Sequence, residues 1–139
     1  MLTRPDTIAA ALADSPAGLL AWIVDKWDDW VDGELSEVVD DSMLFGIATL
    51  YWATGTIGSS FRQYFDWYEN PPRPPIIAPV GVLLSREPAT QGFPRSLAER
   101  AARDLRSFDA APAGGHFLGA EQPAAAAAAI RAFFGSLAH

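Results

Sequence analysis

Apolar residues recur every three or four positions over residues 19–31, and most charged residues of this stretch fall between them. This spacing predicts an amphipathic helix with one apolar face. The Asp-Ser-Pro sequence at positions 14–16 supplies a capping residue and a first-turn proline, and Gly33 follows the expected end of the helix near Val31. A shorter helical stretch, which ends at Leu12, precedes it.

Two further helical stretches follow with less regular spacing. The apolar pattern from Glu37 to Tyr51 fits a helix that Gly55 ends, and Phe61 to Tyr68 mark another helical face. All five tryptophans lie in this half of the chain, which indicates an aromatic core or, for some of them, an apolar ligand pocket between helices. They are Trp22, Trp27, Trp30, Trp52 and Trp67.

The proline-rich segment 71–75 separates the helical half from the rest of the chain, because proline donates no backbone hydrogen bond and disfavours helix before it. Ile76–Leu84 is then a continuous apolar run, as is typical of a parallel strand buried on both faces. The sequence therefore predicts three parts: a helical segment over 1–70, a linker over 71–75 and an α/β segment over 76–139.

The last part of the chain reads as a βαβα pattern. A helix from about Pro94 to Arg103, a strand around Leu105–Phe108 and a helix from about Gln122 to Leu137 follow the first strand. Between the second strand and the last helix lies Gly114-Gly115-His116-Phe117. Paired glycines permit positive φ and close backbone approach, so His116 is a candidate general base on a loop, although a structural histidine fits the same pattern.

Composition narrows the classes of function. The chain has 139 residues, is 50% hydrophobic and carries a net charge of −7, which favours a folded domain and opposes nucleic-acid binding. The absence of cysteine excludes disulfides, thiolate metal sites and cysteine nucleophiles. We expect no cofactor and no metal. Because the sequence contains neither a signal-peptide core nor a membrane-spanning run, we expect a cytoplasmic location.

Several segments, taken together, resemble the microsomal-type epoxide hydrolases of the α/β-hydrolase family. They are LYWATGTIGSSFRQY at 50–64, PVGV at 79–82, GGHF at 114–117 and EQP at 121–123, together with the lid-like segments 3–7 and 14–19. The resemblance covers nearly the whole chain. It implies a partial α/β-hydrolase fold, in which a helical lid segment is followed by a βαβα piece of a doubly wound parallel sheet.

The resemblance also implies a chemistry and roles for individual residues. In that family an aspartate attacks the epoxide to form an ester, a histidine activates the water that cleaves it, and two lid tyrosines donate protons to the epoxide oxygen. The matching motifs give His116 the water-activating role and Tyr64 the role of one lid tyrosine. Tyr64 also falls on the apolar face with Phe61, so a structural role stays open.

The acid that orients the histidine is less well defined. Glu87 lies just beyond the first strand, where the family has its acid, but the match needs a one-residue gap. An exposed glutamate paired with Arg86 or Arg95 is the alternative. Asp104 and Asp109 are weaker candidates, because they border the next strand.

No counterpart of the family's nucleophile-bearing half is found in the chain. We therefore expect it to be the C-terminal part of an epoxide hydrolase, inactive alone, that acts on an apolar epoxide when an N-terminal-half partner or a longer parent chain supplies the missing half. The alternative is a non-catalytic remnant that binds an apolar ligand or serves as an oligomerisation module. Two parallel strands leave apolar surface unpaired, so we expect self-association or such a partner.

Overall fold

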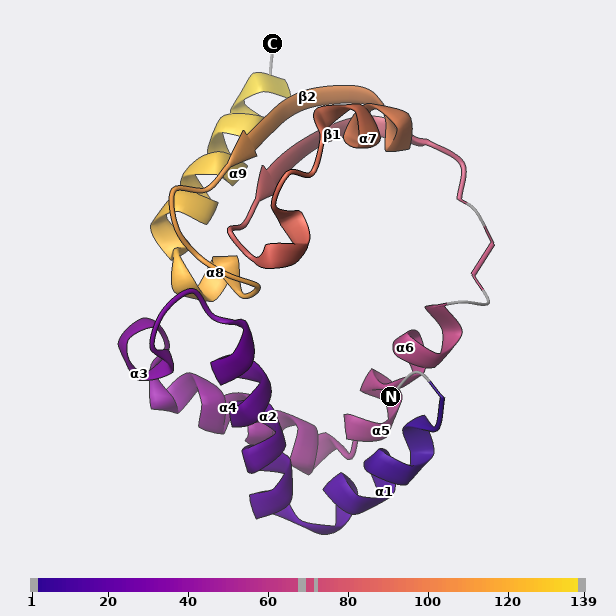
Figure 1. Cartoon of the computed structure of the whole chain (residues 1–139), viewed down its shortest axis with the longest axis vertical. Coiled ribbons are helices and arrows are strands. Elements are labelled where there is room, and N and C mark those ends of the chain that lie inside the picture. The colour runs from indigo at the N-terminus through magenta and orange to yellow at the C-terminus, as the bar shows by residue number, and fades with distance from the viewer. Residues whose placement is uncertain (1–2, 68–69, 72, 138–139) are drawn as a thin grey trace. The chain divides into compact units, whose positions relative to one another are not determined.

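The computed structural model describes residues 3–67, 70–71 and 73–137 (Figure 1). The chain divides into two compact units. The first comprises residues 1–29 and 39–72, and the second comprises residues 30–38 and 73–139. A short piece of the helical half, residues 30–38, therefore packs with the C-terminal unit. The division into parts 1–70, 71–75 and 76–139 stays a prediction about folding domains.

The described residues of the first unit form helices and no strand. The short α5 (Ile57–Ser60) packs against α1 (Pro5–Asp14), and the other helices are α2 (Pro16–Trp30), α4 (Asp41–Thr54) and α6 (Arg62–Asp66). Apolar side chains from the helices and their junctions are buried, and Leu19 is the most completely enclosed. The buried residues of this unit are Leu12, Leu19, Ile23, Trp27, Val39, Leu44, Ala48, Ile57 and Phe61.

The helix predicted from Glu37 to Tyr51 is in fact two helices. A separate turn, α3 (Leu35–Val38), ends before Asp40, whose extended backbone (φ −74°, ψ 135°) begins α4. The Asp40 carboxylate accepts a hydrogen bond from the Ser42 amide at 2.7 Å, and that bond holds the pKa of Asp40 below its usual value. The N-cap therefore interrupts the predicted helix. Residue 68, predicted to end the next helical face, lies outside the described residues.

The prediction of an aromatic core is correct for only some of the tryptophans. Trp27 is buried and Trp22 packs edge-on against Phe61, with ring centroids 6.0 Å apart. Trp52 and Trp67 are 41% and 71% exposed. A pocket lined partly by Trp52 has a volume of about 70 Å³, well below the roughly 300 Å³ at which ligand pockets begin. This pocket does not suit the apolar ligand considered for the helical half.

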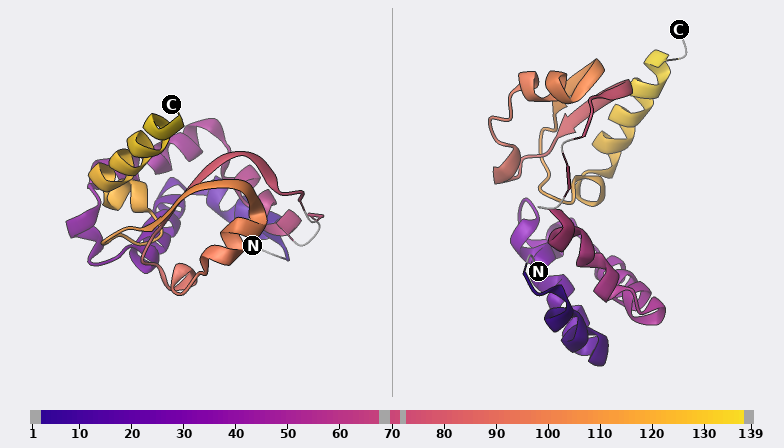
Figure 2. Two further views of the ribbon diagram at one scale, coloured as in Figure 1. Left: turned by 90° about the horizontal axis from the view of Figure 1, so that it is seen from above. Right: turned by 90° about the vertical axis from the view of Figure 1, so that its right-hand side faces the viewer.

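The second unit is built on two parallel strands, β1 (Ile76–Leu84) and β2 (Ala102–Ala110). The helix between them is α7 (Arg95–Ala101), and α9 (Pro123–Leu137) lies on the opposite face of the strands (Figures 1 and 2). The strand pairing runs from Ile76 beside Ala102 to Leu84 beside Ala110. Gly81 permits close packing of α9, since a Cβ at this position would lie 2.7 Å from the Phe133 ring.

β1 has the predicted bounds but not the predicted burial. None of its residues is buried, and Ile76 and Ile77 are 52% and 78% exposed. A continuous apolar run reflects a strand covered on both faces, whereas the described residues form a sheet of two strands only. The expectation that this run leaves apolar side chains uncovered is correct. None of the described helices has the length and hydropathy that a membrane crossing requires.

Candidate active site

Two loops meet at the carboxyl edge of the sheet. Because β1 and β2 are parallel, the loop after Leu84 and the loop after Ala110 leave from the same edge, where open α/β sheets place their ligands. The first loop contains the 3₁₀ turn η2 (Pro88–Thr90), and the second leads into the short helix α8 (Leu118–Glu121). The Arg86 amide donates a hydrogen bond to the Gly114 carbonyl at 2.7 Å and joins the loops.

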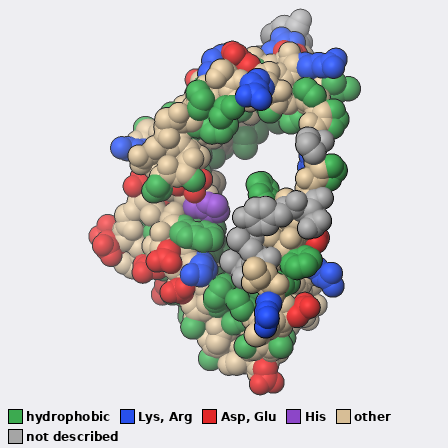
Figure 3. Space-filling model, turned by 45° about the vertical axis from the view of Figure 1, so that its right-hand side comes forward, with side chains coloured by type: hydrophobic (Ala, Val, Ile, Leu, Met, Phe, Trp, Pro, Cys, Tyr) green, Lys and Arg blue, Asp and Glu red, His purple; other side chains and the backbone are tan. Residues whose placement is uncertain are grey.

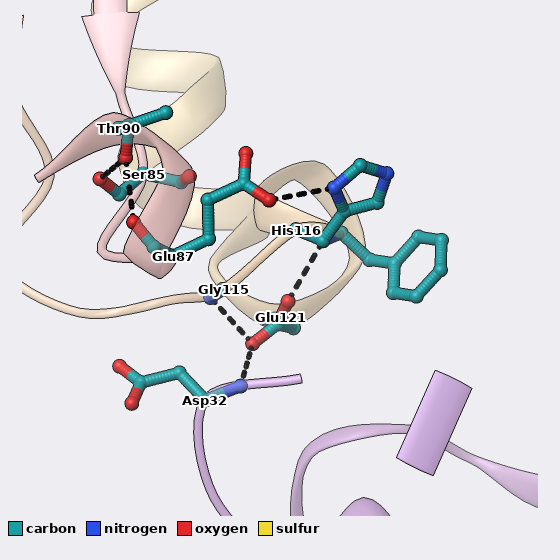
Figure 4. Close-up of polar contacts among 8 residues, drawn as sticks. Asp32, Ser85, Glu87, Thr90, Gly115, His116 and Glu121 are labelled. Atoms are coloured by element: carbon teal, nitrogen blue, oxygen red, sulfur yellow. Dashed lines mark hydrogen bonds and ion pairs between the residues drawn. The ribbon is translucent and has the colours of Figure 1, made fainter. Parts of the chain in front are cut away.

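His116 and Glu87 form a hydrogen-bonded pair across these loops. Nδ1 of His116 lies 2.7 Å from Oε2 of Glu87, and their side chains are 45% and 24% exposed. The imidazole reaches the surface (purple in Figure 3), and its other ring nitrogen points away from the glutamate (Figure 4). With the proton on Nδ1 donated to Glu87, Nε2 carries the lone pair that can take a proton from water.

A local turn fixes the backbone of Glu87. This residue is the N-cap of η2, with φ −60° and ψ 149°. The Thr90 hydroxyl lies 2.7 Å from the Ser85 carbonyl and 3.0 Å from the Glu87 carbonyl, and donates to both. The carboxylate is therefore presented from a closed turn that follows directly on a strand.

The alternative partners of Glu87 are engaged elsewhere. Arg86 donates to the Pro112 carbonyl at 3.2 Å, and Arg95 forms an ion pair with Glu99 at 2.8 Å. Among the described residues, no ion pair links Glu87 to either arginine.

The two weaker acid candidates lie within β2 instead of beside it. Asp104 pairs with Arg106 at 2.6 Å, and Asp109 is exposed on the strand opposite Leu83. The described contacts place neither carboxylate against His116. Glu87 is the acid that the structure brings to the histidine.

The buried carboxylate of Glu121 holds the His116 loop through hydrogen bonds from backbone amides. Its Oε2 accepts hydrogen bonds from the amides of Gly115 at 2.7 Å and Asp32 at 2.8 Å, and its Oε1 accepts from the Phe117 amide at 2.9 Å. Figure 4 shows these bonds converging beneath His116. No role for this carboxylate is predicted from the sequence.

The two glycines before His116 meet different requirements. Gly114 has φ +102°, a backbone conformation that residues other than glycine rarely adopt. Gly115 lies against the backbone of the 30–32 segment, where a Cβ would come within 2.5 Å of the Trp30 carbonyl oxygen and 2.8 Å of the Asp32 nitrogen. The loop therefore needs positive φ at one position and close backbone approach at the next.

We expect Gly115→Ala to destabilise the second unit by about 1–3 kcal/mol, the usual effect of overpacking, because both contacts are with backbone atoms. Gly119→Ala is the matched control. It lies in α8 with open space around it, so a gain of about 0.4–1 kcal/mol is expected. Urea unfolding of both variants measures the difference, and equal stabilities would contradict the observed packing.

Aromatic rings flank the imidazole. The Trp30 ring lies 4.9 Å from His116 at 60°, and the Phe117 ring lies 5.0 Å from it at 85°. The His116 amide also donates to the Trp30 carbonyl at 2.9 Å. The imidazole is therefore bordered by two aromatic rings, and the backbone of Trp30 holds the residue in place.

Tyr64, the third predicted site residue, lies on α6 in the first unit and is half-buried. Its predicted proton-donating role stays a proposal. Within residues 3–67, 70–71 and 73–137, no group of three histidine or acidic side chains is placed to hold a metal ion. The hydrogen-bonded Glu87–His116 pair is an arrangement that is able to transfer a proton.

Comparison with known proteins finds similarity to one class of enzyme. A protein of Stigmatella aurantiaca (strain DW4/3-1), whose name assigns it to the epoxide hydrolases, is 38% identical over 146 residues, which cover 97% of the chain and 31% of the relative. Epoxide hydrolase 1 of Sus scrofa is 32% identical over 158 residues, which cover 97% of the chain and 33% of the relative. The chain thus spans about a third of the length of these relatives.

A solved structure gives the same result for the fold. The crystal structure of juvenile hormone epoxide hydrolase from the silkworm Bombyx mori superposes with a TM-score of 0.84 at 30% identity, covering 97% of this chain and 37% of that chain. No protein-family model matches the chain.

Proposed function

We propose that this chain, which belongs to the epoxide hydrolase family, supplies the water-activating part of an enzyme that hydrolyses apolar epoxides to diols. The resemblance to that family and the partial α/β-hydrolase fold predicted from the sequence are confirmed. The observation that carries the proposal is the 2.7 Å contact between His116 and Glu87 at the carboxyl edge of the parallel strands.

In the proposed reaction, Nε2 of His116 takes a proton from a water molecule as that water attacks an ester between substrate and enzyme. The Glu87 carboxylate accepts a hydrogen bond from Nδ1–H and stabilises the positive charge that develops on the ring. Tyr64 is proposed to donate a hydrogen bond to the epoxide oxygen, where negative charge grows as the strained ring opens.

The rest of the machinery is proposed to come from chain outside these 139 residues. The relatives are about three times as long as the matched region, and a carboxylate nucleophile must be present before there is an ester for His116 to hydrolyse. The partner in this proposal is therefore a segment that carries the nucleophile, either in a longer parent chain or as a separate N-terminal half.

A chimera tests this proposal. In this chimera the chain replaces the matching third of Sus scrofa epoxide hydrolase 1. Hydrolysis of an apolar epoxide such as styrene oxide is then measured as the rate of diol formation. We expect turnover by the chimera and none by the isolated chain, with the unmodified Sus scrofa enzyme as the reference. A folded chimera without activity would contradict the proposed function.

A second candidate function, as a non-catalytic ligand-binding or oligomerisation module, is favoured by a different feature. An apolar groove of about 530 Å³ lies between the strands and α9, with Val82, Ile130 and Phe133 among its lining residues. Its volume is within the range of ligand pockets. An isolated chain that binds apolar ligands here, together with an inactive chimera, would favour this second function.

We expect the isolated chain to self-associate through the uncovered end of β1. Ile77 is 78% exposed, and apolar strands with unpaired edges pair with other chains. Ile77→Lys should lower the average mass measured by light scattering, whereas Leu50→Lys, at a 64% exposed helical position, should leave it unchanged. A stable, cooperatively melting monomer of the unmodified chain would contradict this expectation.

A further inference from the structure

Glu121 is 8% exposed, and among the described residues it is the one buried charged side chain. It forms no ion pair in the described structure, and its hydrogen bonds come from main-chain amides instead. A buried carboxylate is stable when N–H groups replace the water it has lost, and such charge-assisted bonds are stronger than neutral ones. The proposed water-activating chemistry makes no use of this residue.

Glu121 accepts hydrogen bonds from the residues directly before and after His116 in the sequence. The amide before the histidine, from Gly115, and the amide after it, from Phe117, are both held by the same carboxylate at 2.7 and 2.9 Å. With the residues on both sides fixed, the backbone of His116 keeps one orientation. That orientation directs Nδ1 to Glu87.

The carboxylate also fastens the loop to the distant 30–32 segment. The Asp32 amide donates to Glu121, and the Asp32 carboxylate accepts from the Gly114 amide at 3.0 Å. The His116 amide donates to the Trp30 carbonyl at 2.9 Å. These bonds link the loop to residues more than 80 positions earlier in the chain.

We propose that Glu121 is a positioning residue, whose buried carboxylate holds the loop so that His116 meets Glu87. The proposal rests on the proposed function of His116 and adds the residue that sets its geometry. A carboxylate suits three N–H donors because both oxygens accept. The amide of glutamine offers one oxygen and turns an NH₂ group toward an N–H donor.

Nitrogen NMR of the imidazole tests the proposal on the full chain without any assay of activity. The chain has two histidines, so a His139→Asn background leaves His116 as the single imidazole signal. In this background we expect a proton on Nδ1 and a slowly exchanging Nδ1–H resonance, because Nδ1 lies 2.7 Å from the Glu87 carboxylate. Glu121→Gln should lose that resonance although the signals of β1 and β2 persist.

Two control variants separate positioning from general stability. Glu99→Gln, in an exposed ion pair with Arg95, should leave the His116 signal unchanged. Glu87→Gln should lose the Nδ1–H resonance but keep the Gly115 and Phe117 amides protected, because their bonds to Glu121 remain. A Glu121→Gln chain that is folded and retains the Nδ1–H resonance would overturn the proposal.

Hydrogen exchange keeps the proposal testable if the Glu121 variant does not fold. In the unmodified chain the amides of Gly115 and Phe117 should exchange at least about 10²-fold more slowly than in an unstructured chain. Exchange at unprotected rates would overturn the proposal. Because both readouts are independent of epoxide turnover, an inactive chimera would refute the proposed function and leave the result on Glu121 standing.

Discussion

Replacing His116 by glutamine in the chimera is expected to lower steady-state turnover of an apolar epoxide by about 10²- to 10⁴-fold, the usual contribution of a positioned general base. Glutamine keeps roughly the size and polarity of the imidazole but cannot take a proton from water at neutral pH. The loss should fall on kcat, because His116 acts on the water and not on the binding of the epoxide. Initial rates over a range of substrate concentrations measure it.

His139→Gln is the control for this substitution, since it changes the other histidine of the chain. Its turnover should match that of the parent chimera. If His116→Gln retained turnover within about a factor of two, another group would be the base, and the role proposed for His116 would be wrong.

Neutralising Glu87 is expected to have the second large effect. In Glu87→Gln the side-chain amide can donate to Nδ1, which places the ring proton on Nε2, the atom that must take a proton from water. Loss of the correct tautomer and of the charge that stabilises the imidazolium lowers turnover by up to about 10⁴-fold where a carboxylate orients a catalytic histidine. We expect a loss in kcat of that order, measured with the same assay.

Glu99→Gln provides the matched control, because it removes a glutamate charge from an exposed ion pair elsewhere in the same unit. It should leave kcat and KM unchanged. Equal rates for the Glu87 and Glu99 variants would show that the 2.7 Å contact with His116 is structural.

Much of the secondary structure could be predicted from local patterns. The apolar run Ile76–Leu84 forms a strand with the predicted bounds, and the last helix begins one residue later than predicted, at Pro123. Both elements are determined by the composition and periodicity of neighbouring residues, which can be read from the sequence. The long helix predicted from Glu37 is wrong because Asp40, a local capping signal, begins a new helix although the apolar periodicity continues past it.

Burial could not be predicted in the same way. The run in β1 has the composition of a strand covered on both faces, but exposure depends on which elements are present to cover it. With two strands in the described sheet, Ile76 and Ile77 remain exposed. Apolar composition therefore indicates the environment for which a strand is suited, and the structure gives the environment it has.

The candidate site was only partly visible in the sequence. The GGHF motif identified His116. Because the match at Glu87 needs a one-residue gap, the sequence did not decide between a role beside the histidine and an exposed ion pair with an arginine. Only the three-dimensional contacts could decide between them. The role of Glu121 depends on a bond to Asp32 across 89 positions. No spacing along the chain encodes such a contact, because it arises from the packing of residues 30–38 within the second unit.

The most direct test of the account is mass spectrometry of the His116→Gln chimera after brief exposure to styrene oxide. If His116 and Glu87 activate the water that cleaves an ester, the variant should accumulate a covalent adduct with the mass of the whole epoxide, while the parent chimera should show little. Hydroxylamine should release the adduct, as it does with esters. A variant that is fully turnover-deficient yet forms no adduct, or one that hydrolyses the epoxide as fast as the parent, would contradict the account.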